Sequence, residues 1–229
     1  MPRNKIFDYG FLATGLLLQV VTYFIMPHDS IISLVSGLLG ICSVCLTAQG
    51  NILTFVFGFA QVGTYTYLCL TQRFYGEIGI NAYYFATMIY GVYVWRRRLA
   101  AGFSSSGGKH TVSTRRMKTG LFLGIAAATV VLSCLTGAGL ARWTDDSQPY
   151  LDAFTTVPAL VAQVLMILVY REHWYIWLAV DVLSTIMWLR AGNYSMAAQY
   201  AFWCANCLYG YHRWRRLEAT ASEADGQLP

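Results

Sequence analysis

The chain alternates long apolar stretches with short polar ones. A stretch of roughly 17–25 apolar residues is long enough to cross a bilayer as a helix. The pattern predicts eight such helices, over residues 7–26, 31–48, 51–70, 78–95, 119–140, 151–170, 174–190 and 194–212. We therefore expect an all-α integral membrane protein.

Composition and charge agree with this expectation. Hydrophobic residues make up 56% of the 229 residues and charged residues only 12%, which is too little charge to cover a soluble globule of this size. If the first helix starts in the cytoplasm, thirteen of the 16 Lys and Arg fall on the cytoplasmic side, and only Arg73, Arg142 and Arg190 fall outside. The net charge of +5 therefore indicates topology, with both termini cytoplasmic, and does not favour a nucleic-acid partner.

The two halves of the chain resemble each other. Residues 90–97 read Y-G-V-Y-V-W-R-R and residues 209–216 read Y-G-Y-H-R-W-R-R, an offset of 119 that also aligns Tyr75 with Tyr194. Two independent interface anchors would explain the Trp–Arg part, but the shared Tyr–Gly pair favours a repeat. If helices two to four match helices six to eight, helix five returns the chain to its starting side. The expected arrangement is a parallel 3+1+3 repeat with an extra N-terminal helix.

Only one segment has the composition of a linker. Residues 99–118 are rich in Gly, Ser and basic residues, and they separate the two halves. Residues 217–229 are polar and acidic, so we expect them to be disordered. These features divide the chain into an extra helix at 1–30, a first three-helix repeat at 31–98, a cytoplasmic linker with the crossing helix at 99–150, a second repeat at 151–216, and the tail.

A carboxylate interrupts the seventh apolar stretch. Five residues follow one another by three, four, three and four positions and so share one helix face: Trp174, Trp177, Asp181, Ser184 and Trp188. An ionised Asp at the centre of a membrane helix costs about 2.5–3.5 kcal/mol, so it should face the bundle interior or a water-filled cavity. Two interpretations stay open, a packing seam with a neighbouring helix and a binding site. The indoles favour a site, because indole faces stack on flat rings and attract cations.

The last helix of each half offers further polar positions. One stripe runs through Asn81, Tyr84, Met88, Gly91 and Trp95, and its counterpart runs through Gln199, Trp203, Asn206 and Gly210. Taken singly, each polar residue is more often a packing residue than a ligand contact. Together they predict a site between the repeats for a planar compound with a positive ring, hydroxyls or both. The predicted contacts are Trp174, Trp177, Asp181, Ser184, Gln61, Asn81, Tyr84, Gln199, Trp203 and Asn206.

The motif W-x-x-W-x-x-x-D at 174–181, preceded by Glu172 and followed by Y-x5-Y-x8-Y-G-x3-W over 194–214, resembles the PnuC family of nicotinamide riboside transporters. These are relatives of the SWEET and semiSWEET sugar carriers, and the resemblance covers roughly residues 31–216. It implies a full-length SWEET-like fold, facilitated diffusion of the riboside, and trapping by a cytoplasmic kinase. It also implies substrate binding by Trp174, Trp177 and Asp181, a lipid environment, and a homo-oligomer such as a trimer.

The first half departs from this motif. At the offset of 119, Phe55, Gly58 and Val62 stand opposite the two tryptophans and the aspartate. The site should therefore be asymmetric. Carriers of thiamine and riboflavin share the motif, so these vitamins remain alternative substrates.

Other classes of protein lack the residues that they need. A retinal protein needs a lysine inside a span, and all three lysines lie outside the spans. A membrane-bound oxidoreductase, the alternative from another class, would need histidines within helices, whereas the four histidines lie in loops or at helix edges. A hydrolase would need a base near Asp181. The C-x-x-C pairs at 42–45 and 204–207 lie inside apolar spans, where Cys behaves as a small hydrophobe. We expect no catalytic residue, metal or cofactor.

Overall fold

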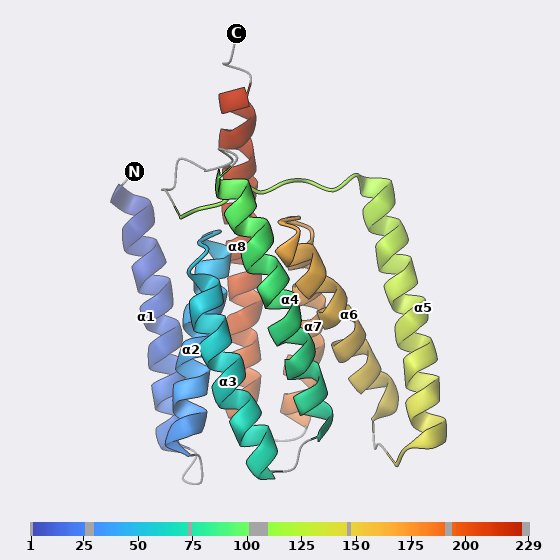
Figure 1. Cartoon of the computed structure of the whole chain (residues 1–229). Helices are drawn as coiled ribbons and strands as arrows, with labels where there is room; N and C mark the ends of the chain where they lie inside the picture. Colours follow the sequence, from blue (N-terminus) through green and yellow to red (C-terminus); the bar gives the residue numbers. More distant parts are fainter. Residues whose placement is uncertain are drawn as a thin grey trace. The chain divides into compact units, whose positions relative to one another are not determined.

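A computed structural model describes residues 2–25, 30–72, 75–100, 110–145, 148–190 and 194–225. These residues form eight helices (Figure 1), in agreement with the eight stretches expected from the sequence. The helices are α1 (Pro2–Ile25), α2 (Ile31–Ala48), α3 (Thr54–Gln72), α4 (Tyr75–Ala100), α5 (Thr119–Trp143), α6 (Pro149–Ile167), α7 (His173–Arg190) and α8 (Tyr194–Asp225).

The helices belong to two compact units, residues 1–112 and 113–229. In the first unit, α2 packs against α1 and α3, and α3 packs against α4. In the second unit, α6 packs against α5 and α7, and α7 packs against α8. The helix expected to cross between the repeats, α5, is thus part of the second unit.

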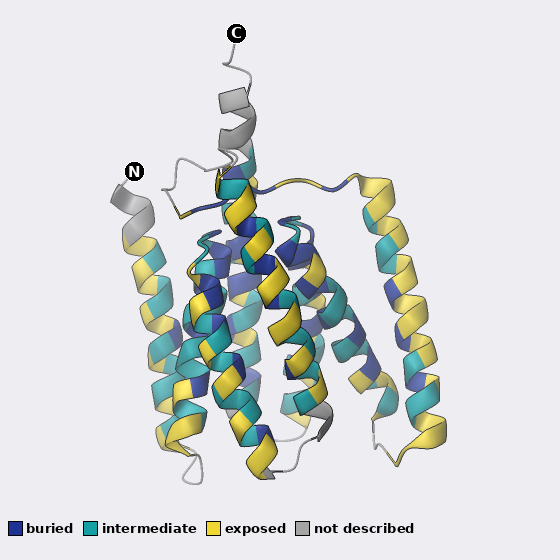
Figure 2. Cartoon of the chain, viewed as in Figure 1, coloured by how far each residue is buried: buried dark blue, intermediate teal, exposed yellow. Residues whose placement is uncertain are grey.

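Large apolar side chains cover much of the outside of these helices. Figure 2 shows α5 mostly in the colours of exposed and intermediate residues. On this helix only Thr129, Ser133 and Gly137 are buried, while Leu123 and Leu135 are at least 60% exposed. By length and composition, four helices are able to cross a membrane, over Ile6–Ile25, Ile31–Ala48, Thr119–Trp143 and Pro149–Ile167. The other four helices carry the polar candidate residues, which lower their hydropathy. Exposed apolar faces of this extent fit a lipid environment.

The turn between α2 and α3 closes α2 with a Schellman motif. The Gly50 N–H donates to the Thr47 carbonyl and the Asn51 N–H donates to the Leu46 carbonyl, both at 2.9 Å. Gly50 has a φ of 67°, which glycine adopts without steric cost. The motif thereby pairs two carbonyls that the end of the helix would otherwise leave free.

The turn between α6 and α7 repeats this arrangement 119 residues later. The Val169 N–H donates to the Met166 carbonyl and the Tyr170 N–H donates to the Leu165 carbonyl, again at 2.9 Å. Val169 has a φ of 57°, a left-handed conformation that β-branched residues rarely adopt. The internal repeat seen in the sequence is therefore present in the backbone hydrogen bonds of the two turns.

The predicted linker is ordered where the structure describes it. Leu99 and Ala100 belong to α4, and residues 101–109 lie outside the described residues. In the first unit the Val112 N–H donates to the Gly50 carbonyl at 3.0 Å, and in the second unit the Arg115 N–H donates to the Val169 carbonyl at 3.0 Å. Residues 111–114 are buried. Each repeated turn therefore receives a backbone hydrogen bond from the segment that joins the halves.

The end of the chain also differs from expectation. α8 continues to Asp225, although the sequence predicts disorder from residue 217, and residues 226–229 lie outside the described part. Residues 217–225 read L-E-A-T-A-S-E-A-D. Ala and Glu are strong helix formers, so they extend a helix that is already nucleated.

Candidate functional site

Asp181 lies in the middle of α7 and is 4% exposed. Its carboxylate oxygen Oδ2 accepts a hydrogen bond from the Cys207 thiol of α8 at 3.3 Å. Its backbone carbonyl accepts a second hydrogen bond from the Thr185 hydroxyl at 2.7 Å. Among the residues that the structure describes, no Lys, Arg or His forms an ion pair with it. A buried carboxylate with so weak a donor is suited to receive a cation or hydroxyl groups from a ligand.

Trp174 lies two turns before Asp181 on α7 and is 4% exposed. Its ring centroid is 4.4 Å from that of His173 and 5.8 Å from that of Trp214, which it meets edge to face. The indole also fills the space above Gly210 of α8, where even a Cβ atom would overlap it. Trp174 is therefore part of the packed core of the second unit.

Trp177 is placed differently, since it keeps part of its surface accessible. It packs against an apolar cluster that includes Met117, Leu165 and Ile176. It shares its helix face with Asp181 and with Ser184, which is 3% exposed. Of the two tryptophans in the motif, Trp177 is thus the one with accessible surface.

The candidate residues of α8 lie on the helix that supplies the thiol. Asn206 precedes Cys207 and is 2% exposed, so it lies near the level of Asp181. Trp203 and Gln199, one and two turns earlier, are half-buried. The Trp203 indole contacts the Tyr200 ring edge to face at 4.8 Å, and its buried N–H has no hydrogen-bond partner within the described residues.

The remaining candidates belong to the first unit. Asn81 of α4 is 4% exposed, and Tyr84 and Gln61 are half-buried. Gln61 faces α2, because a Cβ atom added to Gly40 would lie 3.5 Å from the Gln61 Cγ. The aromatic pair Trp174–Trp214 has its counterpart here in Phe55–Trp95, which also meet edge to face, with centroids 5.2 Å apart.

Two polar features were not identified from the sequence. Cys207, which the sequence predicts to behave as a small hydrophobe, follows Asn206 of the predicted stripe and donates a hydrogen bond to Asp181. In the first unit, Ser43, Thr47 and Thr54 join α2 to the start of α3, with 2.6 Å between the two threonine hydroxyls. Helical Ser and Thr commonly bond their own backbone, so nothing in the sequence marks this cluster.

Comparison with known proteins decides the family. Residues 30–216 match the model of the family described as nicotinamide mononucleotide transporter. The chain belongs to this family. The resemblance that the motif suggested is thereby confirmed, and the protein is a membrane transporter by family.

Curated relatives align over nearly the whole chain. The nicotinamide riboside transporter PnuC of Haemophilus influenzae is 31% identical over 218 residues, covering 93% of this chain and 91% of the relative. That of Neisseria mucosa is also 31% identical, covering 92% and 81%. A crystal structure of the vitamin B3 transporter PnuC superposes with a TM-score of 0.76 at 29% identity, covering 93% of this chain and 92% of that one. This match confirms the all-α fold.

Proposed function

We propose that this protein transports nicotinamide riboside across the bacterial inner membrane. The observation that carries the proposal is Asp181, a buried mid-helix carboxylate whose only side-chain hydrogen bond within the described residues comes from a thiol. Nicotinamide riboside has a flat, positively charged pyridinium ring and ribose hydroxyls. It can balance the carboxylate, donate hydrogen bonds to it and stack on an indole. The curated relatives carry this substrate in their names.

The candidate residues divide the work of binding. Trp177 stacks on the pyridinium ring, and Asp181 faces its charge or accepts hydrogen bonds from the ribose. Ser184, Gln199, Trp203 and Asn206 orient the polar groups, and Trp174 holds the inner end of α7 against α8 while it borders the ligand.

The proposed transport is facilitated diffusion. The substrate moves down its gradient, and a cytoplasmic kinase traps it by phosphorylation. Both termini lie in the cytoplasm, because that orientation leaves only three of 16 basic residues outside. An impermeant thiol reagent should therefore fail to label a cysteine placed at Ser105, in a cysteine-free background in intact cells. Labelling of this cysteine would show that the linker faces the outside and would contradict the proposed orientation.

Calorimetry of the purified protein tests the substrate. Nicotinamide riboside should bind, and its reduced dihydro form should bind at least roughly tenfold more weakly, because it keeps the hydroxyls but lacks the charge that faces Asp181. Thiamine has a positive ring and a hydroxyl and is the strongest competitor, and riboflavin completes the panel. Tighter binding of thiamine than of nicotinamide riboside would overturn the proposed substrate.

The Trp177→Ala variant tests the stacking role in the same assay. Loss of one indole stack should weaken binding by about 1–3 kcal/mol, and Trp177→Phe should recover part of the loss. Trp143→Ala is the matched control, because Trp143 is 80% exposed at the end of α5. An unchanged affinity for nicotinamide riboside in a folded Trp177→Ala protein would show that Trp177 has only a packing role.

A further inference from the structure

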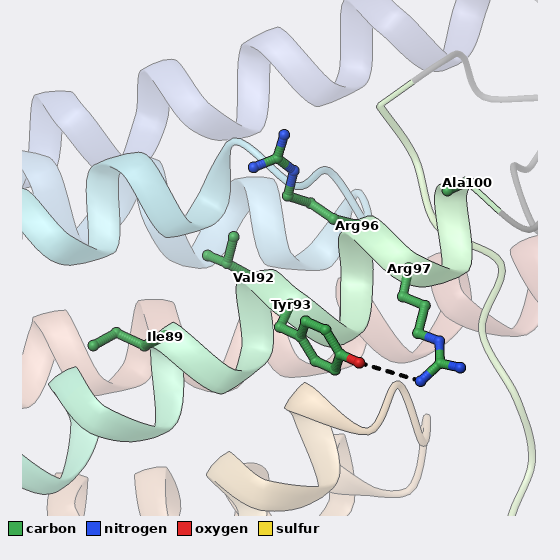
Figure 3. Close-up of a pocket in the computed structure, with 6 residues that line it drawn as sticks. All are labelled: Ile89, Val92, Tyr93, Arg96, Arg97 and Ala100. Carbon is green, nitrogen blue, oxygen red and sulfur yellow. Dashed lines mark hydrogen bonds between the residues drawn. The ribbon is translucent and has the colours of Figure 1, made fainter.

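The arginine-bearing end of α4 carries a shallow, open groove along the surface of this one helix, and the groove takes no part in the proposed substrate site. Its volume is about 520 Å³, and six residues at helical spacing line it: Ile89, Val92, Tyr93, Arg96, Arg97 and Ala100 (Figure 3). The lining changes in character along the helix. Apolar side chains come first, a tyrosine follows, and two arginines lie near the helix end.

The groove is open to the surroundings of the protein. Ile89 is 56% exposed and Tyr93 is 57% exposed, and both arginines are exposed as well. On a membrane helix, the surroundings of exposed apolar residues are lipid chains, while tyrosine and arginine lie at the level of the headgroups. The groove therefore spans the boundary between the chains and the headgroups of one leaflet.

The two guanidinium groups lack a compensating charge. Neither Arg96 nor Arg97 forms an ion pair with any residue that the structure describes. Arg97 donates a hydrogen bond to the Tyr93 hydroxyl at 3.2 Å, which fixes its position and leaves the Tyr93 O–H proton free to donate in turn. Figure 3 shows Arg96 and Arg97 pointing away from each other, so negative charge on either side of the helix can be met.

We propose that this groove binds an anionic phospholipid. Its acyl chains lie along Ile89 and Val92, and its phosphodiester accepts hydrogen bonds from the Arg97 guanidinium and the Tyr93 hydroxyl, while Arg96 meets negative charge on the other side of the helix. Guanidinium–phosphate pairs are charge-assisted and often bidentate, and basic pockets on membrane helices recognise anionic headgroups in this way. A zwitterionic lipid fills the same groove less well, because its ammonium group opposes the arginines.

The internal repeat supplies a control for the charge. At the offset of 119, Arg215 and Arg216 of α8 correspond to Arg96 and Arg97 and are also exposed. The surrounding face differs, however. Val92 corresponds to Tyr211, whose ring packs against Tyr175 at 4.8 Å and lies under the Arg171 guanidinium at 5.8 Å. Arg215 and Arg216 therefore lie near a tyrosine, Tyr211, that already contacts other residues of the second unit.

Native mass spectrometry of the full chain tests the proposal. The protein is titrated with phosphatidylglycerol and phosphatidylcholine of the same acyl chains, and the ratio of the two bound lipids is measured. Wild type should prefer phosphatidylglycerol, and R96Q/R97Q should lose this preference by at least roughly tenfold. R215Q/R216Q removes the same charge and should keep the wild-type preference. Tyr93→Phe, which removes only the hydroxyl, should lose part of it and decides the matter if R96Q/R97Q does not fold.

Three results would overturn the site. A wild-type lipid preference in R96Q/R97Q or in Tyr93→Phe would show that the groove does not determine which lipid binds. An equal loss of the phosphatidylglycerol preference in the two double variants would show that the preference comes from the basic charge at the helix ends and not from the groove. A change of oligomeric mass in R96Q/R97Q, with no change in lipid preference, would assign the face to a second copy of the chain.

Discussion

The Gly210→Ala variant should lose about 3 kcal/mol of folding stability, the upper end of what overpacking costs. An added Cβ would lie 2.6 Å from the Cε2 and Cη2 atoms of the Trp174 indole. The indole cannot easily yield, because its other faces contact His173 and Trp214. Either the ring must leave its position or α8 must move away from α7. A thermal unfolding midpoint in detergent, followed by tryptophan fluorescence, measures the loss.

Two further variants show whether the cause is this contact. Gly63→Ala on α3 is the matched control, since a Cβ there has no neighbour within 4 Å. It should leave the midpoint unchanged or raise it, because Ala is the better helix former. Trp174→Phe should restore part of the stability lost in Gly210→Ala, as the smaller ring makes room. A Gly210→Ala protein as stable as wild type would contradict the packed position of Trp174.

The helices could be predicted from the sequence because each is a long apolar run between polar breaks. The expected span 31–48 coincides with Ile31–Ala48, and 174–190 differs from His173–Arg190 by one residue. The boundary at Ser30 also has a local cause, because its side chain accepts a hydrogen bond from the Ser33 N–H at 3.1 Å. The helices α4 and α8 end later than expected, because the hydropathy of the sequence falls before each helix ends.

The turns show what the sequence does not reveal. Gly50 is a recognisable helix terminator, but at the matching position stands Val169, which has the opposite preference and still adopts a φ of 57°. Burial of the Val169 side chain and the hydrogen bond from Arg115 favour the conformation that its own backbone disfavours. The order of residues 110–117 has a similar origin. It depends on partners about 50 to 100 residues away in the chain, and composition carries no information about them.

The sequence predicts the candidate site as a set of residues on one face of a helix. Residues on such a face can pack against a neighbouring helix or bind a ligand, and their spacing does not distinguish the two roles. Trp174 and Trp177 both belong to the predicted stripe. Trp174 packs against Trp214 and is 4% exposed, whereas Trp177 keeps accessible surface. The difference arises from Gly210, which lets α8 approach the first residue of the pair. The Asp181–Cys207 contact was equally hidden, because the side chains of two helices set it.

The Asp181→Asn variant should bind nicotinamide riboside roughly tenfold to a hundredfold more weakly, the effect of removing a charge from a hydrogen-bonded contact. Asparagine keeps the size and an acceptor oxygen, so the fold should survive. Asp152→Asn is the matched control, because Asp152 lies exposed in the first turn of α6. Calorimetry on the two variants separates the role of the buried carboxylate from that of negative charge in general.

The same variant addresses how transport is driven. A proton-coupled carrier needs a group in the pathway that gains and loses a proton as the site changes sides, usually a carboxylate or a histidine. In the described part of the chain, Asp181 is the buried carboxylate in the middle of a helix. If it balances the cationic ring, it must be ionised whenever substrate is bound, so it cannot carry a proton in the same direction. A sodium site would need a cage of oxygen ligands in addition to this carboxylate.

We therefore expect a uniporter. In proteoliposomes a substrate gradient should drive flux, and an imposed proton or sodium gradient should produce no accumulation above equilibrium. The membrane potential has to be clamped, because a cationic substrate responds to it by about 2.3 kcal/mol per 100 mV and would imitate coupling. Asp181→Asn should still equilibrate substrate, with half-saturation at a higher concentration. Concentrative uptake by wild type under a proton gradient, lost in an Asp181→Asn protein that binds normally, would refute the uniport mechanism and assign Asp181 to proton transfer.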